Sequence, residues 1–357
     1  MTNYRFGDRI KSAYLKLIGD KTMNKALKIT LITLAVIVGF VALVLLGVKV
    51  GEKLIFSSFY SNAEKEFKMP GTGDNLVQQG MVYIEEKDLI LVCGYMSDNT
   101  ASRVYTLSRD GKVLSITQLK NEDGSDYTGH TGGIEYFEGY VYITEGTGEK
   151  GYDGGLDVFP LDDFITGKEA SSKIGRVKTY NNPSCCHIYN GYMLVGEYFR
   201  EVDYETSDSH RIDTPAGDKN TALTMVFKMD KSITDNFGMS NEPVSCISTR
   251  DAVQGIYTID DDKIVLSTSW GLSASNLYFY DMSKVTKGET NIQVDGLDIP
   301  VYFLDSVSLA EVVKAPPMSE EMLYLDGRLF ILNESACNKY IFGKFMSGNY
   351  MYSYEIK

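Results

Sequence analysis

The chain has 357 residues, of which 43% are hydrophobic and 23% charged, and its formal net charge is −13. Its length and hydrophobicity exclude a disulfide-stapled miniprotein and a disordered tail. The acidic balance argues against nucleic-acid binding, because neutralising phosphates needs a basic face. The 25 tyrosines and 16 phenylalanines, against only 8 prolines, indicate a strand-rich interior.

The N-terminal segment differs from the rest of the chain in charge. Residues 1–53 carry nine basic and three acidic side chains, whereas the remaining residues carry 26 basic and 45 acidic ones. Within this segment, Ile29–Val48 reads ITLITLAVIVGFVALVLLGV and has no charged residue. Twenty helical residues span roughly 30 Å, the thickness of a bilayer's hydrocarbon core. We therefore predict a transmembrane signal-anchor at 29–48, embedded in the lipid bilayer.

The flanking charges predict the orientation of this anchor. Seven basic residues precede it, and only Lys49 and Lys53 follow it closely. By the positive-inside rule, residues 1–28 form a short cytoplasmic tail and the domain after the anchor is extracytoplasmic, as in a single-pass protein of the cell membrane. Two other interpretations exist. A cleavable signal peptide has a shorter apolar region that ends in small residues, and a buried helix of a soluble domain would be amphipathic.

A repeated pattern begins near residue 76. A small residue, a short apolar run, a polar turn and a second apolar run recur five times, and the apolar runs begin at Met81, Ile134, His187, Ile256 and Met322. Glu138-Gly139, Asn190-Gly191 and Asp326-Gly327 are dipeptides typical of hairpin turns. Further strands are expected at 103–107, 156–161, 223–229 and 276–281, and then at 113–119, 174–180, 244–249 and 301–309.

Four strands in each repeat of 50–70 residues are typical of a β-propeller. We predict an all-β fold, a five-bladed β-propeller at 76–357 preceded by one N-terminal transmembrane helix. The last repeat lacks an outer strand, which the linker at 49–75 is able to supply and so close the ring. A pair of packed sheets is the alternative arrangement.

In a propeller, the residues before each first strand and after each second strand converge on one mouth of the channel. We predict ligand-binding residues there: Gln79, Tyr95, Gln254 and Trp270. Glu145, Glu197 and Glu334 follow second strands, and carboxylates that converge favour a divalent cation, Ca²⁺ or Mg²⁺. The alternatives are carboxylates that cap strand ends or face solvent, and aromatic residues that only fill the sheets.

Few residues are suited to acid–base catalysis. The candidates are His187 and His130, together with Glu197, whereas His210 lies in a polar loop and is expected to be solvated. The sequence contains none of the HExxH, GxSxG, Walker or CxxC motifs. Its five cysteines are an odd number, so they cannot all pair within one chain.

Four motifs, QQGMVYI…SRVYTL, GHTGGI, VQGIYTI…STSWG…NLYFYD and PPMSEEMLYLDGRLFILNESA, resemble a family of secreted or membrane-anchored bacterial β-propeller proteins without an established function. The element that begins at Gln79-Gly80 is more distantly similar to plant-type glutaminyl cyclotransferases, which are five-bladed propellers that cyclise N-terminal glutamine. That second similarity implies five blades, and no catalytic residue is carried over from it.

The function expected from these observations is a membrane-anchored extracytoplasmic module that binds an unknown extracellular ligand or protein. The alternative is an enzyme, a metal-assisted hydrolase, lactonase or glutaminyl cyclotransferase at the channel mouth. A structural role in the cell envelope is a third possibility. Inferring function from the propeller fold alone is analogy.

Overall fold

The structure is a computed structural model that describes residues 24–146 and 154–356. The chain forms two compact units, Met1–Gly51 and Glu52–Lys357. Helix α2 (Lys25–Ile55) is long and apolar enough to cross a membrane, and none of its most apolar stretch is buried. That exposure contradicts a buried helix of a soluble core. A membrane anchor and a signal sequence both have these features.

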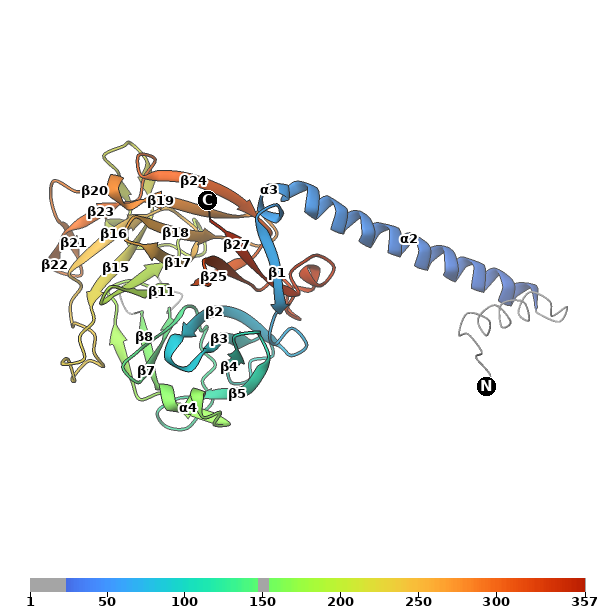
Figure 1. Cartoon of the computed structure of the whole chain (residues 1–357), viewed down its shortest axis with the longest axis horizontal. Coiled ribbons are helices and arrows are strands. Elements are labelled where there is room, and N and C mark those ends of the chain that lie inside the picture. The colour runs from blue at the N-terminus through green and yellow to red at the C-terminus, as the bar shows by residue number, and fades with distance from the viewer. Residues whose placement is uncertain (1–23, 147–153, 357) are drawn as a thin grey trace. The chain divides into compact units, whose positions relative to one another are not determined.

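The second unit is a five-bladed β-propeller, as the sequence predicts (Figure 1). Five antiparallel sheets follow one another, and each begins with its innermost strand. The inner strands contact one another in the closed order β2, β6, β11, β17, β25 and back to β2. The sheets comprise β2 (Leu76–Ile84), β3 (Leu89–Met96), β4 (Arg103–Ser108) and β5 (Val113–Lys120); β6 (Ile134–Phe137), β7 (Tyr140–Glu145), β8 (Gly155–Pro160) and β10 (Gly175–Lys178); β11 (Pro183–Tyr189), β12 (Tyr192–Glu197), β15 (Ala222–Lys228) and β16 (Ser245–Thr249); β17 (Val253–Asp260), β18 (Lys263–Thr268), β19 (Ser275–Asp281) and β24 (Leu309–Ala315); β25 (Ser319–Leu325), β26 (Arg328–Asn333) and β27 (Tyr350–Glu355).

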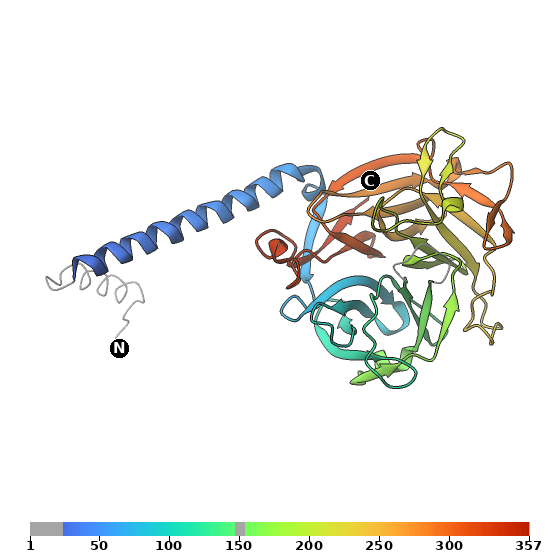
Figure 2. The same ribbon diagram turned by 180° about the vertical axis from the view of Figure 1, so that it is seen from behind.

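The fifth sheet is completed from the other end of the propeller. Strand β1 (Ala63–Lys68) pairs antiparallel with β27 and forms the outer edge of this sheet. Figure 2 shows β1, in blue, beside the red C-terminal strands. The backbone carbonyl of Asn62, just before β1, accepts a hydrogen bond from Arg328 on β26. The ring is therefore closed by hydrogen bonds between segments almost 300 residues apart in sequence.

Three hairpin turns have the predicted geometry. Glu138-Gly139, Asn190-Gly191 and Asp326-Gly327 have positive φ at both residues, which is the type I′ conformation that matches the twist of paired strands. The remaining short elements are α3 (Ser57–Tyr60), α4 (Leu161–Ile165), the 3₁₀ turns η1 (Glu85–Lys87), η2 (Asp208–His210), η3 (Met282–Lys284) and η4 (Ile341–Lys344), and strands β13 (Ile212–Asp213), β14 (Lys219–Asn220), β21 (Ile292–Val294) and β22 (Leu297–Ile299).

One strand prediction was wrong. Residues 301–309 do not form the outer strand of the fourth sheet, which is β24. Instead β23 (Val301–Phe303) adds to the third sheet by pairing parallel with β16, and β20 (Thr286–Lys287) pairs with β23 in turn. In the same way β9 (Ala170–Ser172) pairs parallel with β5 of the first sheet. β24 exposes most of its residues, so its apolar pattern is weak, whereas β23 is a short apolar run that covers a sheet edge.

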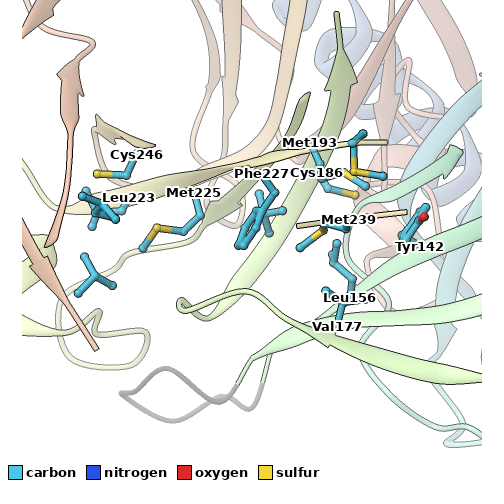
Figure 3. Close-up of a cluster of buried hydrophobic side chains, with 14 of the residues drawn as sticks. Tyr142, Leu156, Val177, Cys186, Met193, Leu223, Met225, Phe227, Met239 and Cys246 are labelled. Atoms are coloured by element: carbon cyan, nitrogen blue, oxygen red, sulfur yellow. The ribbon is translucent and has the colours of Figure 1, made fainter. Parts of the chain in front are cut away.

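The core is divided among the interfaces between neighbouring sheets. Within the described residues, five buried clusters are found, and each joins side chains of two adjacent sheets. Figure 3 shows the cluster between the second and third sheets, where Tyr142 and Leu156 face Met193 and Phe227. Because the inner two strands of each sheet are buried on both faces, they are nearly continuous apolar runs, and this explains the repeated runs in the sequence.

Candidate functional site

The inner strands share a bulge close to their first residues. Pairing skips one residue in three of them, at Gln79 of β2, Ser184 of β11 and Gln254 of β17, and it skips two residues in β25, of which Glu320 is the first. A bulge leaves an extra residue unpaired and redirects its side chain. The four residues therefore occupy equivalent places at one end of the channel, and two of them are predicted ligand-binding residues.

Next to the bulges, the inner strands approach one another too closely for side chains. A Cβ atom at Gly80 would lie 2.5 Å from the carbonyl oxygen of Gly132, and one at Gly133 would lie 2.5 Å from the backbone nitrogen of Cys186. A Cβ at Gly255 would lie 2.7 Å from the carbonyl oxygen of Glu320. The small residue at the start of these repeats is therefore required by backbone packing, which narrows the channel at this level.

A polar cluster lies on the side of this constriction where the inner strands begin. We call it the acidic mouth and define it as Gln79, Gln254, Ser269, Glu320 and Glu334. The side-chain amide of Gln79 donates a hydrogen bond to Glu334 over 2.8 Å. The amide of Gln254 lies 3.5 Å from Glu320, and the hydroxyl of Ser269 bonds the same carboxyl. The acidic mouth thus joins residues from the first, fourth and fifth sheets.

The two carboxyls of the acidic mouth hold protons unusually tightly. Burial raises the pKa of Glu334 to about 8, although Lys339 and the hydrogen bond from Gln79 act in the opposite direction. Burial raises the pKa of Glu320 well above its usual value, and the charges of Glu334 and Glu321 raise it further. At neutral pH the pair therefore retains at least one proton, because two buried carboxylates side by side repel each other.

Aromatic side chains border the acidic mouth. The Tyr95 ring contacts the exposed His130 ring in a tilted arrangement, with centroids 4.4 Å apart, and its hydroxyl lies 2.6 Å from Nζ of Lys339. On the other side, Tyr198 donates a hydrogen bond to the carbonyl of Ser269.

A second aromatic group continues outward from Tyr198. Tyr204 contacts both Tyr198 and Trp270 through ring edges, and Arg200 lies 3.5 Å above the Trp270 ring. Trp270 is 43% exposed. Of the predicted ligand-binding residues, Gln79, Tyr95 and Gln254 therefore lie at the mouth, and Trp270 lies on its outer border.

The three predicted metal ligands do not share one site. Glu197 pairs with Pro183 across the third sheet, and Asn333 occupies the matching position in the fifth, opposite Ser319. Glu334 is thus one residue further along its strand than Glu197. Because side chains alternate between faces, this offset directs the two carboxylates to different faces.

Glu145 and Glu197 have local partners instead. Glu197 binds His210 Nδ1 at 2.7 Å and the backbone N–H of Leu223 at 2.9 Å. Glu145 accepts a hydrogen bond from Tyr127, and burial raises its pKa to about 7. Within residues 24–146 and 154–356, no group of three acidic, histidine or cysteine side chains is arranged to hold a metal ion. The Ca²⁺ or Mg²⁺ site stays a prediction that this geometry does not support.

The histidines are placed differently from one another. His130 lies at the border of the acidic mouth, whereas His187 faces the opposite end of the channel, where it stacks on Tyr257. The prediction that His210 is solvated is wrong. Its side chain is fully buried, and it forms a hydrogen bond with Glu197. His187, His130 and Glu197 therefore do not form one catalytic group.

The five cysteines are buried and unpaired with one another. Burial raises the pKa of Cys93 to about 12, and those of Cys185 and Cys186 rise well above their usual value. These thiols are consequently poor nucleophiles, because the thiolate is the reactive form. They act as packing residues.

Sequence reasoning underestimated several residues of this site. Glu320 lies just before the apolar run that begins at Met322, and the doubled acid Glu320-Glu321 is the sequence signal for it. Tyr198, Ser269 and Lys339 carry no sequence signal of their own, since only the register of the strands places them at the mouth.

Comparison with known proteins gives distant likenesses. No protein-family model and no curated protein matches the sequence. Among solved structures, the chain is similar to a Bacteroides caccae protein of unknown function, with a TM-score of 0.36 and 12% identity over 68% of this chain and 73% of that one. An exo-β-1,3-galactanase from Phanerochaete chrysosporium matches with a TM-score of 0.44 and 11% identity, over 82% of this chain and 64% of the galactanase. A PQQ-bound aldose sugar dehydrogenase from Streptomyces coelicolor matches with a TM-score of 0.43 and 11% identity, over 82% of this chain and 96% of the dehydrogenase. At these scores we draw no functional argument from the likenesses.

Proposed function

We propose that the propeller binds a neutral, hydroxyl-rich ligand, a saccharide, at the acidic mouth. The observation that carries this proposal is the buried pair Glu320 and Glu334, each contacted by a glutamine from another sheet. Protonated carboxyls and amides both donate and accept hydrogen bonds, as sugar hydroxyls do. A few convergent polar groups of this kind orient a ligand in a concave site.

Charge favours a neutral ligand over a cationic one. Lys339 already lies close enough to lower the pKa of Glu334, and its Nζ contacts the hydroxyl of Tyr95. Because Lys339 already balances the charge of one carboxylate, a cationic ligand would gain little further electrostatic attraction at the acidic mouth. A neutral ligand leaves that balance unchanged and uses the donors and acceptors that remain.

The aromatic border suits the flat apolar faces of sugar rings. Tyr198, Tyr204 and Trp270 form a connected group beside Ser269. Arg200 covers one face of the indole, while the remaining exposure of Trp270 leaves area for stacking. An extended saccharide is thereby able to contact the carboxyls and this group together.

We further propose that α2 anchors the propeller to the cell membrane with residues 1–28 in the cytoplasm. The basic residues that precede Ile29–Val48 support this orientation. The propeller then faces the outside of the cell, where free saccharides and polysaccharides are available. Protease treatment of intact cells tests the topology: digestion of the propeller only after lysis would contradict it.

An immobilised array of neutral glycans tests the saccharide proposal on the full chain in detergent. We expect binding that Glu320→Gln and Gln79→Leu weaken, and that the exposed Glu311→Gln on β24 leaves unchanged. Trp270→Ala should weaken binding of longer glycans more than of monosaccharides. Binding that is equal in all four variants, or absent for every glycan on the array, would overturn the proposal.

Hydrolysis of the bound saccharide is the second candidate. It is favoured by the raised pKa of Glu334 and Glu320, because a carboxyl that is protonated at neutral pH is suited to act as a general acid. The test is release of new reducing ends from the glycans that bind. Turnover that falls further in Glu320→Gln than its binding does would support an enzyme, and binding of the wild-type protein without turnover would support a binding module alone.

A further inference from the structure

A second cavity lies at the opposite end of the channel. We call it the lower funnel; it has a volume of about 630 Å³, and all five inner strands contribute to its lining. It lies beyond the level at which Gly80, Gly133 and Gly255 bring the inner strands together. Residues of the lower funnel include Tyr83, Glu135, Tyr136, His187, Tyr257 and Tyr324.

Two polar side chains at the lower funnel are almost fully buried. Glu135 is 8% exposed and accepts a hydrogen bond of 2.8 Å from the backbone N–H of Ile188. Among the described residues, no salt bridge to Glu135 is found. His187 is 6% exposed, and its Nε2 has no hydrogen-bond partner within the described part of the chain. Buried polar groups without partners are rare, and each such group needs an explanation.

The walls and rim of the lower funnel favour positive charge. The His187 ring stacks on Tyr257 with centroids 4.0 Å apart, and further tyrosines form the walls. Aromatic faces attract cations through the negative potential of the ring. At the rim, Glu85, Glu86 and Glu138 outnumber Lys87. The lower funnel thus combines a buried acid, aromatic walls and an acidic entrance.

We propose that the lower funnel binds an organic ammonium ion, with the Glu135 carboxylate as its counter-ion and His187 Nε2 as a hydrogen-bond acceptor. A primary ammonium group carries three N–H donors and no acceptor. Its donors match the carboxylate and the free imidazole nitrogen, and its alkyl or aryl body fills the aromatic and apolar walls. The proposal does not depend on saccharide binding, because the two sites lie at opposite ends of the channel.

The protonation equilibria of Glu135 and His187 make ammonium binding depend on pH. Burial raises the pKa of Glu135 to about 8 and lowers that of His187 to about 4. The other titratable groups close to Glu135 are Tyr136 of β6, Glu321 of β25, Tyr257 of β17 and Cys186 of β11. A bound ammonium ion favours the ionised carboxylate, so binding releases a proton from Glu135. Its affinity should therefore rise with pH up to about 8, a range in which an alkylamine stays protonated.

Isothermal titration calorimetry on the full chain in lipid nanodiscs tests the proposal with two matched probes. Phenethylammonium is cationic, and 2-phenylethanol has a similar body without the charge. We expect the ammonium ion to bind and the alcohol to bind at least about tenfold more weakly, since a buried charge is paired only in the first case. Equal affinity for both probes, or no binding of the ammonium ion, would overturn the proposal.

Variants assign the binding to the lower funnel. Glu135→Gln preserves shape and should weaken phenethylammonium binding by about tenfold or more, and His187→Phe should weaken it to a smaller extent. Glu311→Gln, on the exposed part of β24, should not change it. Comparison of the two probes on the wild-type protein remains decisive if the Glu135 variant fails to fold. Wild-type affinity in a folded Glu135→Gln variant would contradict the assignment.

Discussion

Gln79 of β2 and Glu334, the residue after β26, are separated by 255 positions in sequence but joined by a hydrogen bond of 2.8 Å. Both side chains are buried. The contact connects the first sheet with the last and lies within the acidic mouth. The same pair of residues therefore contributes both to closure of the ring and to the proposed ligand site.

Gln79→Leu should lower the free energy of unfolding by about 1–3 kcal/mol, because the buried carboxyl of Glu334 loses its donor. The matched variant Gln254→Leu should cost less, since its contact with Glu320 is long at 3.5 Å. Urea unfolding of the full chain in detergent measures both. An equal or larger loss in Gln254→Leu would mean that the amide of Gln79 is not a significant partner of Glu334.

Gly133→Ala should destabilise the propeller by about 1–3 kcal/mol, the usual cost of overpacking. Its Cβ would lie 2.5 Å from the backbone nitrogen of Cys186 and 2.9 Å from Glu321. Gly73→Ala is the control, because a Cβ there meets nothing within 4 Å. The thermal midpoints of the two variants are compared. Similar midpoints would show that the inner strands separate readily.

Arg328→Met should lower the free energy of unfolding by roughly 1.5–3 kcal/mol, as expected for hydrogen bonds from a charged donor. Arg328 binds the carbonyls of Asn62 and Ser353 and the Ser353 hydroxyl, and so holds β1 against the fifth sheet. Chemical denaturation is the measurement, with the exposed Lys231→Met as control. Proteolysis near β1 should also accelerate; an unchanged cleavage rate would contradict a role of Arg328 in ring closure.

His210→Ala should cost about 1–3 kcal/mol, because the buried carboxylate of Glu197 loses a partner at 2.7 Å. The segment between β12 and β15 should become more sensitive to limited proteolysis. His130→Ala provides the contrast, since His130 is exposed and its loss should leave stability nearly unchanged. A larger loss of stability in His130→Ala than in His210→Ala would instead support the solvated His210 that the sequence predicts.

Stability should fall as pH rises from about 5 to 8, in part because of Glu135. Its pKa in the folded protein is about 8, above the usual 4.5. Between pH 4.5 and about pH 8, the Glu135 side chain is ionised in the unfolded chain but keeps its proton in the folded protein. The free energy of unfolding therefore falls by up to about 1.4 kcal/mol for each pH unit in this range. Below this range both states are protonated, and above it both are ionised.

Glu135→Gln should flatten this dependence, because the amide still accepts the Ile188 N–H but does not titrate. Unfolding free energies of the wild-type and variant proteins at pH 5 and pH 8 provide the comparison. Parallel pH profiles would show that Glu135 is already ionised at neutral pH.

The sequence predicted the positions of most strands, but it predicted only part of their pairing with strands distant in sequence. Paired apolar runs predicted the five hairpins, and Glu-Gly, Asn-Gly and Asp-Gly dipeptides predicted the turns of three of them, because such turns are local devices with strict backbone requirements. The parallel pairing of β23 with β16 was not predictable, since a three-residue apolar run does not indicate which sheet edge it covers. The equivalence of Glu197 and Glu334 failed by a single residue, which is enough to reverse the direction of a side chain.

By itself, the sequence determined the charge-free segment at 29–48, the acidic character of the following domain and the repetition that indicates five blades. These follow from composition and period, which are properties of neighbouring residues. Only the tertiary structure decided which polar residues meet: Gln79 with Glu334, Gln254 with Glu320, and Glu197 with His210. Such meetings depend on strand register, bulges and closure of the ring, where a shift of one position moves a side chain to the other face of its sheet.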